Sequence, residues 1–402
     1  MTAGVRPCQP RPRAAARTLW SRACLPWPVP GASRVTNTMP TTADPTVIAL
    51  DWGTSNLRAF LIDAGGGILA QRERPWGILS LPKPAADGGF DDALDGIAGD
   101  WLAAAPAATV IASGMVGSAQ GWHEAAYLPC PVDAERLAAR LTTFATRSGR
   151  PLAIVPGLLQ DAADALPDVM RGEETQVFGA LGMLEAAERT EAAGGACCFV
   201  LPGTHSKWVA VRDRRIERFA TCMTGELYAV LRQHSILGRL MPSATGSAGA
   251  TGTTGTTRSG ASAAADRAVG AAAFDQALAL ARDSRPGELV RQLFTVRSMR
   301  LAGRLPAAAL PDYLSGLLIG HELTSMTHDF AGAERLPLVL IGEPALTARY
   351  RTAFAAFGLP VTILENTAAA GLFAIARQSA GGHAVPAGHD HRGSGRSSGA
   401  TR

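Results

Sequence analysis

Runs of apolar residues separated by short polar turns cover most of the chain, and they predict strands at its start. Residues 46–54, TVIALDWGT, and residues 57–63, LRAFLID, are rich in strand-forming residues and are joined by a tight turn. Further strands are expected over 65–78, 108–122 and 151–158, the second ending in a glycine-rich loop, and helical periodicity is found over 91–105 and 172–193. This pattern predicts an α/β protein.

The opening pattern begins a second time about 150 residues later. Residues 196–227, ACCFVLPGTHSKWVAVRDRRIERFATCMTGEL, predict a strand, a polar turn, a strand, a charged turn and a third strand. Two unrelated hairpins would give the same pattern, but we favour duplication of one domain architecture.

The composition suits a two-domain protein that is soluble and cytoplasmic. A chain of 402 residues is long enough for about two domains, and 47% of its residues are hydrophobic. No apolar run reaches the length that spans a bilayer. Six arginines and no acid within 1–39 account for more than the whole net charge of +4. Nucleic acid and membrane are therefore not expected as partners.

Three segments are expected to be disordered or flexible. Residues 1–39 resemble a transit peptide, or sequence translated from a mis-assigned start with Met39 as the real one, which we favour because the segment is rich in proline. Residues 242–268 form a low-complexity segment rich in Gly, Ser, Thr and Ala. The tail over 381–402 is similar, and we interpret its His389, Asp390 and His391 as solvated rather than metal-binding.

The cysteines indicate a reducing compartment. No C-x-x-C pair occurs, and two of the six lie together in an apolar run. Buried thiols are favoured over a disulfide or metal role for Cys8, Cys24, Cys130, Cys197, Cys198 and Cys222.

The first polar turn is a candidate phosphate site. Glycine followed by small hydroxyl residues exposes backbone N–H groups that suit phosphate oxygens, here Gly53, Thr54, Ser55 and Asn56. Asp51 could act on phosphate only through a divalent cation such as Mg²⁺. An Asp that caps a hairpin turn would have the same sequence.

The second turn repeats this chemistry with Gly203 and Thr204, now followed by His205 and Lys207. Two facing phosphate hairpins are what a nucleotide-binding cleft needs. Lys207 could equally be a solvated strand residue, and His205 could bond only to the backbone.

Seven blocks in a fixed order resemble the 2-dehydro-3-deoxygalactonokinase family, within the sugar-kinase/hexokinase/actin superfamily. The resemblance covers about 46–378, apart from the low-complexity segment, and its blocks are LDWGTSNLRAFL, ASGMVGSAQGW, VMRGEETQVFGAL, LPGTHSKWV, MTGELYAVLRQHSILG, YLSGLLIGHEL and LIGEPALTARYRTAF. It implies two ribonuclease-H-like domains of the actin-like ATPase fold, over 46–165 and 166–380, with ATP and sugar bound between them.

The resemblance also implies a catalytic base. A kinase needs a carboxylate that accepts the proton of the acceptor hydroxyl. In glycerol- and xylulose-type kinases this acid follows a glycine, and by position it is Glu173, although glutamate replaces aspartate here. Glu174 is the second candidate. Both could instead be ordinary first-turn acids of a surface helix.

A sugar acid needs a cationic anchor for its carboxylate, and Arg171 can pair with one bidentately unless it pairs with Glu174. The loop after the fourth expected strand adds Ser113, Gly114, Gln120 and Trp122, the last of which could also be a core residue.

By position in the superfamily, Gly342 lets adenosine approach the backbone, although it could simply open a helix. Thr224, Gly225 and Glu226 are expected to line the cleft, with Gly225 near the phosphates, whereas His234 and His321 are interpreted as structural.

The implied function is a magnesium-dependent transfer of phosphate from ATP to the terminal hydroxyl of 2-dehydro-3-deoxy-D-galactonate in galactonate catabolism. A kinase of another 2-keto-3-deoxy acid, such as 2-dehydro-3-deoxygluconate, is the first alternative. An ATP-dependent switch or a sugar sensor of the same fold is the second. A homodimer is left open.

Overall fold

The computed structural model describes residues 45–161, 166–187, 196–242, 260–330, 336–365 and 367–381. All of them belong to one compact unit, Ala43–Arg402. The expected N-terminal extension over 1–39 and the expected tail beyond 381, with its two histidines, lie outside the described residues. The division into domains over 46–165 and 166–380 stays a prediction.

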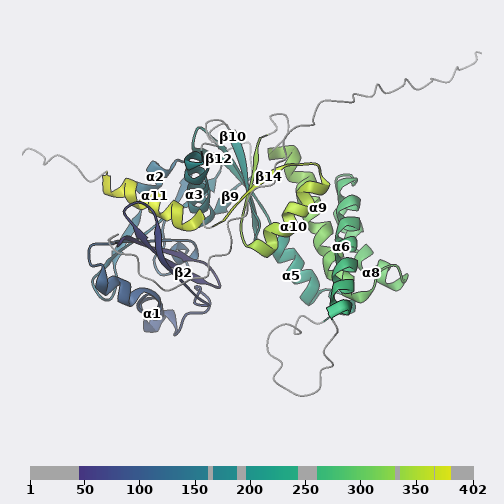
Figure 1. Cartoon of the computed structure of the whole chain (residues 1–402), viewed down its shortest axis with the longest axis horizontal. Helices are drawn as coiled ribbons and strands as arrows, with labels where there is room; N and C mark the ends of the chain where they lie inside the picture. Colours follow the sequence, from purple (N-terminus) through teal and green to yellow (C-terminus); the bar gives the residue numbers. More distant parts are fainter. Residues whose placement is uncertain are drawn as a thin grey trace, which may run out of the picture. The chain divides into compact units, whose positions relative to one another are not determined.

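The first sheet has six strands in the order β3-β2-β1-β4-β7-β6. It contains the strand labelled β2 in Figure 1. Its strands are β1 Pro45–Trp52, β2 Leu57–Asp63, β3 Ile68–Arg74, β4 Thr109–Ser113, β6 Thr142–Ala145 and β7 Pro151–Ile154. β1 is antiparallel to β2 and parallel to β4. Alternate residues of β1 enter two different cores, Ile48, Leu50 and Trp52 one of them and Val47 and Ala49 the other. Burial on both faces explains the continuous apolar run of this strand.

The second sheet repeats the first. Its order is β12-β11-β10-β13-β14, with β10 antiparallel to β11 and parallel to β13. Its strands are β10 Ala196–Leu201, β11 Ser206–Arg212, β12 Arg215–Cys222, β13 Leu338–Ile341 and β14 Val361–Leu364. The recurrence of strand, turn, strand, turn, strand that the sequence predicted is confirmed, and it extends to the order and direction of five strands in each sheet.

The strand expected over 151–158 is interrupted and serves two sheets. β7 ends at Ile154, and β8 (Gly157–Gln160) pairs with β5 (Tyr127–Pro129) and β9 (Asp168–Met170) in a small third sheet. Pro156 lies at the break, where it has no N–H to offer a ladder. The prediction of one strand was wrong for this reason.

Helices cover the sheets, and two of them cross through glycines. They are α1 Gly89–Ala104, α2 Ala134–Ala138, α3 Glu173–Ala186, α5 Thr224–His234, α6 Gly260–Arg282, α7 Leu289–Leu293, α8 Thr295–Leu301, α9 Leu310–Phe330, α10 Pro344–Ala356 and α11 Thr367–Gly381. A methyl group on Gly179 of α3 would meet the Thr367 carbonyl of α11 at 1.9 Å, and one on Gly371 would meet the Thr175 carbonyl at 1.9 Å. α3 and α11 therefore need both glycines.

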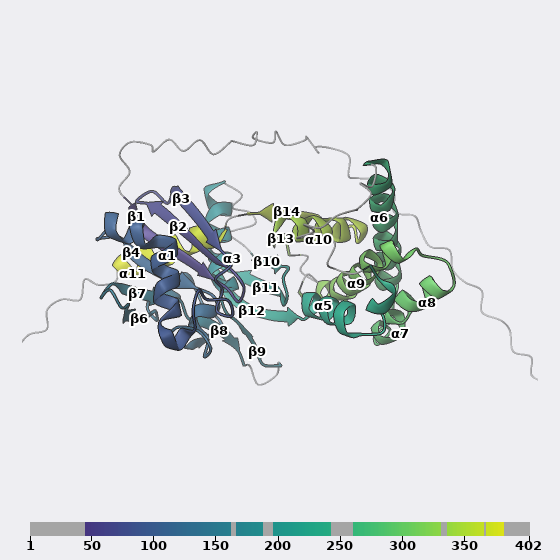
Figure 2. The same ribbon diagram turned by 90° about the horizontal axis from the view of Figure 1, so that it is seen from below.

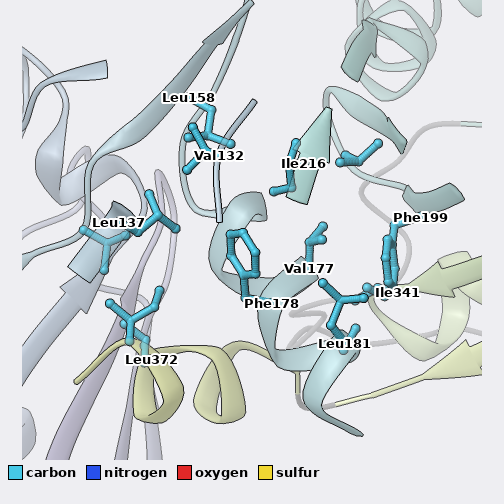
Figure 3. Packing of buried hydrophobic residues seen from close by; sticks show 14 of the residues in the cluster. Val132, Leu137, Leu158, Val177, Phe178, Leu181, Phe199, Ile216, Ile341 and Leu372 are labelled. Atoms are coloured by element: carbon cyan, nitrogen blue, oxygen red, sulfur yellow. The ribbon is translucent and has the colours of Figure 1, made fainter. Parts of the chain in front are cut away.

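α3 lies within a core that joins residues of both sheets. Figure 3 shows Phe178 toward Leu137, and Leu181 toward Ile341. Because the helix is surrounded by apolar neighbours, its sequence is apolar on several faces rather than on one stripe.

α6 and α9 lie side by side (Figure 2), and they too pack through small residues. A methyl group on Gly316 would lie 2.5 Å from the Phe274 carbonyl, and one on Gly320 would lie 2.5 Å from the Ala281 Cβ. The low-complexity segment was expected to run to residue 268, but α6 begins at Gly260. Alanine has the highest helix propensity, so ASAAADRAVGAAA continues the helix that the glycines and serines were expected to prevent.

The described cysteines, Cys130, Cys197, Cys198 and Cys222, are free thiols. Burial raises the pKa of Cys197 and of Cys198 to about 12, so both remain protonated. Within the part of the chain that the structure describes, no helix has the length and apolar character to cross a bilayer.

Candidate active site

A cavity of about 500 Å³ lies where the carboxyl ends of β1, β4, β10 and β13 meet the first residues of α3, α10 and α11. Open α/β sheets commonly bind ligands at this end of their strands. Ten residues expected from the sequence line the cavity: Asp51, Gly53, Thr54, Gly114, Arg171, Glu173, Gly203, Thr204, His205 and Gly342. Residues from distant parts of the sequence therefore form one site.

Asp51 is paired with a residue that sequence reasoning missed. It lies opposite Arg58 in the antiparallel register of β1 and β2, and Arg58 Nη2 donates to Asp51 Oδ2 at 2.5 Å. The Asp51 side chain is 12% exposed, and both residues line the cavity. The sequence could have indicated Arg58, because it is the one charged residue of β2 before the terminal Asp63, and the rest of the strand is apolar.

The first hairpin is held from behind. Ile78 N–H donates to the Gly53 carbonyl and Leu79 N–H donates to the Thr54 carbonyl, at 3.1 and 3.2 Å. The carbonyl groups of the turn are thereby occupied. Gly53 and Thr54 line the cavity. Because the carbonyl groups of the turn already accept hydrogen bonds, the turn is better suited to bind an anion than a cation.

The second hairpin is supported by the start of α5. Gly203, Thr204 and His205 connect β10 to β11 and line the cavity. A methyl group on Gly225 would lie 2.3 Å from the Gly203 carbonyl, so Gly225 lets the helix pack under the turn rather than lining the cavity itself. Glu226 N–H donates to the Thr204 carbonyl, and its carboxylate lies 2.5 Å from His205 Nε2.

The two acids at the start of α3 have different environments. Glu173 lines the cavity, and its Oε2 accepts the Arg171 N–H at 3.1 Å. Glu174 is fully buried, and both of its carboxylate oxygens accept the Gly172 N–H, at 2.9 and 2.7 Å. Only Glu173 is therefore placed to meet a ligand in this cavity.

Burial is the main electrostatic influence on both acids. It raises the pKa of Glu173, and the positive charge of Lys207 partly opposes this. Burial and the neighbouring Glu173 raise the pKa of Glu174 to about 8. The pair thus resists carrying two negative charges, as expected for adjacent buried carboxyl groups.

Arg171 has a buried guanidinium group with unused donors. The residue is 8% exposed and lines the cavity. Its Nη2 donates to the Ala125 carbonyl at 2.7 Å, and its guanidinium carbon lies 4.2 Å from the centre of the Tyr127 ring. Within the described residues, Nε and Nη1 have no hydrogen-bond partner. It does not pair with Glu174, the alternative that the sequence left open. A buried cation with free donors is suited to bind an anionic group.

Other expected residues lie away from the cavity. Ser55 and Asn56 are exposed, and Asn56 Nδ2 donates to Glu73 at 3.0 Å. Gln120 is exposed. Ser113 is buried at the end of β4 and lies opposite Asp51 in the register. None of these four lines the cavity.

Trp122 belongs to an aromatic cluster. Its ring stacks on Phe90 at 5.6 Å and meets the edges of Trp52 and Phe144 at 5.9 and 5.1 Å. It does not line the cavity. This placement supports the core interpretation over a contact with sugar, and it also accounts for Trp52, whose indole N–H donates to the Trp76 carbonyl at 2.8 Å.

The part of the cavity around Gly342 contains acids that sequence reasoning also missed. Gly342 lines it with Glu343 and Pro344, between β13 and α10, and Glu365 lies before α11. The expected strand, Gly-Glu turn and helix over this segment are confirmed. No sequence motif indicates Glu365, and it reaches the cavity only because β14 ends just before it.

One cavity thus contains two hairpin turns with glycine and threonine, a carboxylate at the end of the first strand and a second carboxylate at a helix start. These are features of a phosphotransferase. The comparisons with known proteins agree. The family model described as 2-keto-3-deoxy-galactonokinase matches residues 51–375. The chain belongs to this family, as its sequence blocks predicted, and is a kinase of this kind.

Relatives and a solved structure match over most of their length. The "Probable 2-dehydro-3-deoxygalactonokinase DgoK1" of Rhizobium meliloti (strain 1021) is 38% identical over 82% of this chain and 96% of its own. The 2-dehydro-3-deoxygalactonokinase of Escherichia coli (strain K12) is 35% identical over 82% and 97%. The crystal structure of "a putative 2-dehydro-3-deoxygalactonokinase protein from Sinorhizobium meliloti" has 33% identity and a TM-score of 0.66, covering 84% of this chain and 100% of that one.

Proposed function

We propose that this kinase transfers the γ-phosphoryl group of ATP to the terminal hydroxyl of 2-dehydro-3-deoxy-D-galactonate, which gives the 6-phosphate in galactonate catabolism. The observation that carries this proposal is the placement of Arg171 and Glu173 on one cavity wall, the first with unused donors and the second as a carboxylate at a helix start. A sugar acid offers the carboxylate that the first needs and the hydroxyl that the second needs.

The nucleotide would lie against the two hairpins and Gly342. Backbone N–H groups of Thr54 and of the turn at Gly203–Thr204 would bind phosphate oxygens, whereas the Gly53 N–H already donates to the Asn56 carbonyl. Asp51 is the carboxylate suited to hold Mg²⁺, which prefers one or two carboxylates together with phosphates and water. When bound, Mg²⁺ would neutralise charge on the transferring phosphate. Arg58 would then lose Asp51 as its hydrogen-bond partner and would pair with a phosphate group of the bound nucleotide instead.

Glu173 would accept the proton of the acceptor hydroxyl. Its position at the first residue of α3 places it in the positive field of the helix N-terminus, which favours the ionised form. Burial acts in the opposite direction. Because burial prevails and raises the pKa of Glu173, its carboxylate is a stronger base than one in water. A stronger base suits proton abstraction near neutral pH.

The repeated strand order supports two ribonuclease-H-like domains of the actin-like ATPase fold, over 46–165 and 166–380. Closure of these domains would exclude water, which competes as phosphoryl acceptor. A cytoplasmic location and a homodimer stay predictions.

A kinase of 2-dehydro-3-deoxygluconate is the alternative that Arg171 also supports, because a guanidinium group binds the shared carboxylate irrespective of the stereocentre in which the two acids differ. ADP release measured with each acid, and with neutral sugars as controls, tests the proposal. We expect the galactonate derivative to give the highest kcat/KM. Equal or higher activity with another acid would reassign the substrate, and ATP hydrolysis unaffected by all acids would favour a switch.

A further inference from the structure

Lys207 was expected to bind phosphate, but its side chain is held elsewhere. It is the second residue of β11 and is 5% exposed. Its Nζ donates to Thr221 Oγ1 at 2.7 Å and to the Val169 carbonyl at 3.2 Å. It is not among the residues that line the cavity, although Gly203, Thr204 and His205 just before it are. Two of its three N–H groups thus serve the protein rather than a ligand.

One partner of Lys207, Val169, belongs to the segment that leads to Glu173, and the other, Thr221, is hydrogen-bonded to that segment. Val169 lies in β9, four residues before Glu173. Asp168, at the start of β9, accepts the Thr221 N–H at 2.6 Å and the Thr221 hydroxyl at 2.7 Å. Lys207 and Thr221 are directly opposite each other in the register of β11 and β12. Three hydrogen bonds therefore fix β9 to the hairpin that follows the second phosphate turn.

The other end of this segment is fixed to the first sheet. A methyl group on Gly172 would lie 3.1 Å from the Gly114 Cα, directly after β4. Any displacement of β11 relative to β4 would therefore act on the short stretch 168–173 from both ends. Glu173 is the residue of this stretch that faces the cavity as a carboxylate.

Lys207 also influences Glu173 through its charge. It lowers the pKa of Glu173 against the effect of burial, whereas the negative charge of Asp51 raises that pKa. Among the described residues, the other charged groups that adjoin Glu173 or line the cavity are Glu174, Arg171, Arg58, His205, Glu343 and Glu365. Lys207 is the cation that acts on Glu173 most strongly.

We propose that Lys207 is a positioning residue that connects the second phosphate hairpin to the segment carrying Glu173, and that it holds this carboxylate in place and ionised without contacting phosphate. The inference rests on the proposed role of Glu173 as the base. It means that a nucleotide bound at Gly203 and Thr204 would order the base through β11.

The variants Lys207→Met, Lys207→Arg and Thr221→Val separate this role from phosphate binding. Met removes the charge and the donors, Arg keeps the charge, and Val removes only the hydroxyl partner. Affinity for a non-hydrolysable ATP analogue is measured by calorimetry, and kcat is measured from pH 5 to 9 in the full chain. Analogue binding also reports whether each variant is folded.

For Lys207→Met we expect kcat to fall about 100-fold, as a displaced catalytic group commonly does, while analogue affinity changes less than about twofold. The acid limb of the kcat profile should move to higher pH, since a cation that favours the carboxylate is lost. Lys207→Arg and Thr221→Val should keep the wild-type acid limb, with smaller losses in kcat. If Lys207→Met does not fold, Lys207→Arg carries the test.

The inference would be overturned if Lys207→Met bound the analogue tenfold or more weakly while its acid limb did not move, because Lys207 would then bind phosphate. Where Lys207→Met does not fold, the same result in Lys207→Arg would overturn it. The proposed base is tested apart from it with Glu173→Gln. If that variant retains near-normal turnover, the base assignment fails and this inference fails with it. If that variant is inactive and Lys207→Met is unaffected in kcat, this inference alone fails.

Discussion

Gly172 lies against Gly114 so closely that a methyl group on Gly172 would come within 3.1 Å of the Gly114 Cα. Gly114 in turn lies against the end of β1, where its own methyl group would meet the Trp52 carbonyl at 2.8 Å. Both glycines have positive φ, 108° and 95°. This contact fixes the distance between the turn after Asp51 and the start of α3, and so between the proposed metal ligand and the proposed base.

Gly114→Ala should therefore reduce activity as well as stability. A side chain at positive φ costs about 1–3 kcal/mol, and here the added methyl group also displaces the Trp52 carbonyl. Gly149 is the matched control, because its φ is 78° but no atom lies within 4 Å of the position of its missing Cβ. Denaturant unfolding should show a loss in both variants, while steady-state kinetics should show a loss of kcat only in Gly114→Ala. Equal kcat in the two variants would contradict the role of the contact.

Arg171→Met should raise the KM for the sugar acid. Loss of a charged hydrogen-bonding partner costs about 1.5–3 kcal/mol, which corresponds to roughly 10- to 100-fold in affinity. Affinity for ATP should stay the same. As a control, the KM for an acceptor sugar that lacks the carboxylate should be similar in wild type and variant. Unchanged KM for the acid in a folded variant would remove Arg171 from the substrate site.

The sequence predicted the repeated sheet because the relevant signals are local. The apolar runs around Asp51 and Gly203 and the polar turns after them are each contained in about ten residues. The start of α3 at Glu173 was equally local, since a glycine precedes a run with helical periodicity. Residues of these two turns and of this helix start are among the ten expected residues that line the cavity.

The remaining site could not be predicted because it depends on long-range register. Lys207 has the same sequence signal whether its ammonium group enters the cavity or bonds to Thr221, which is determined by the pairing of β11 with β12. Trp122 in a glycine-rich loop resembles a sugar platform, and only the positions of Phe90 and Phe144 make it a core residue.

Glu174 should make the stability of the protein depend on pH. Its pKa of about 8 in the folded state lies above the usual carboxyl range, so the folded chain binds more protons than the unfolded chain between about pH 4.5 and 8. Stability contributed by this group is present at low pH and is lost as the pH rises through that window. Glu174→Gln cannot titrate, and its side-chain oxygen can still accept the Gly172 N–H.

Unfolding free energies of wild type and Glu174→Gln, measured by denaturant titration at several pH values from 5 to 9, check this. We expect wild type to lose stability relative to the variant as the pH rises. Parallel curves would mean that Glu174 does not hold a proton in the folded state.

Asp51→Asn should raise the Mg²⁺ concentration that gives half-maximal activity by at least about tenfold, since the carboxylate that we propose holds the metal is neutralised. Asp283→Asn is a matched control, because Asp283 is also paired with an arginine, Arg282, but does not line the cavity. A magnesium titration of both variants should separate them. The same half-maximal concentration in both would exclude Asp51 as the metal ligand.

The most direct test of the account is the rate of phosphoryl transfer by Glu173→Gln with saturating ATP and 2-dehydro-3-deoxy-D-galactonate, followed as ADP release in a single turnover. The substitution keeps the size of the side chain and removes its ability to accept a proton. Loss of a general base costs about 10²- to 10⁴-fold, so we expect a decrease in this range with binding of both substrates preserved. Near-normal turnover by a folded Glu173→Gln variant would contradict the assignment of Glu173 as the base.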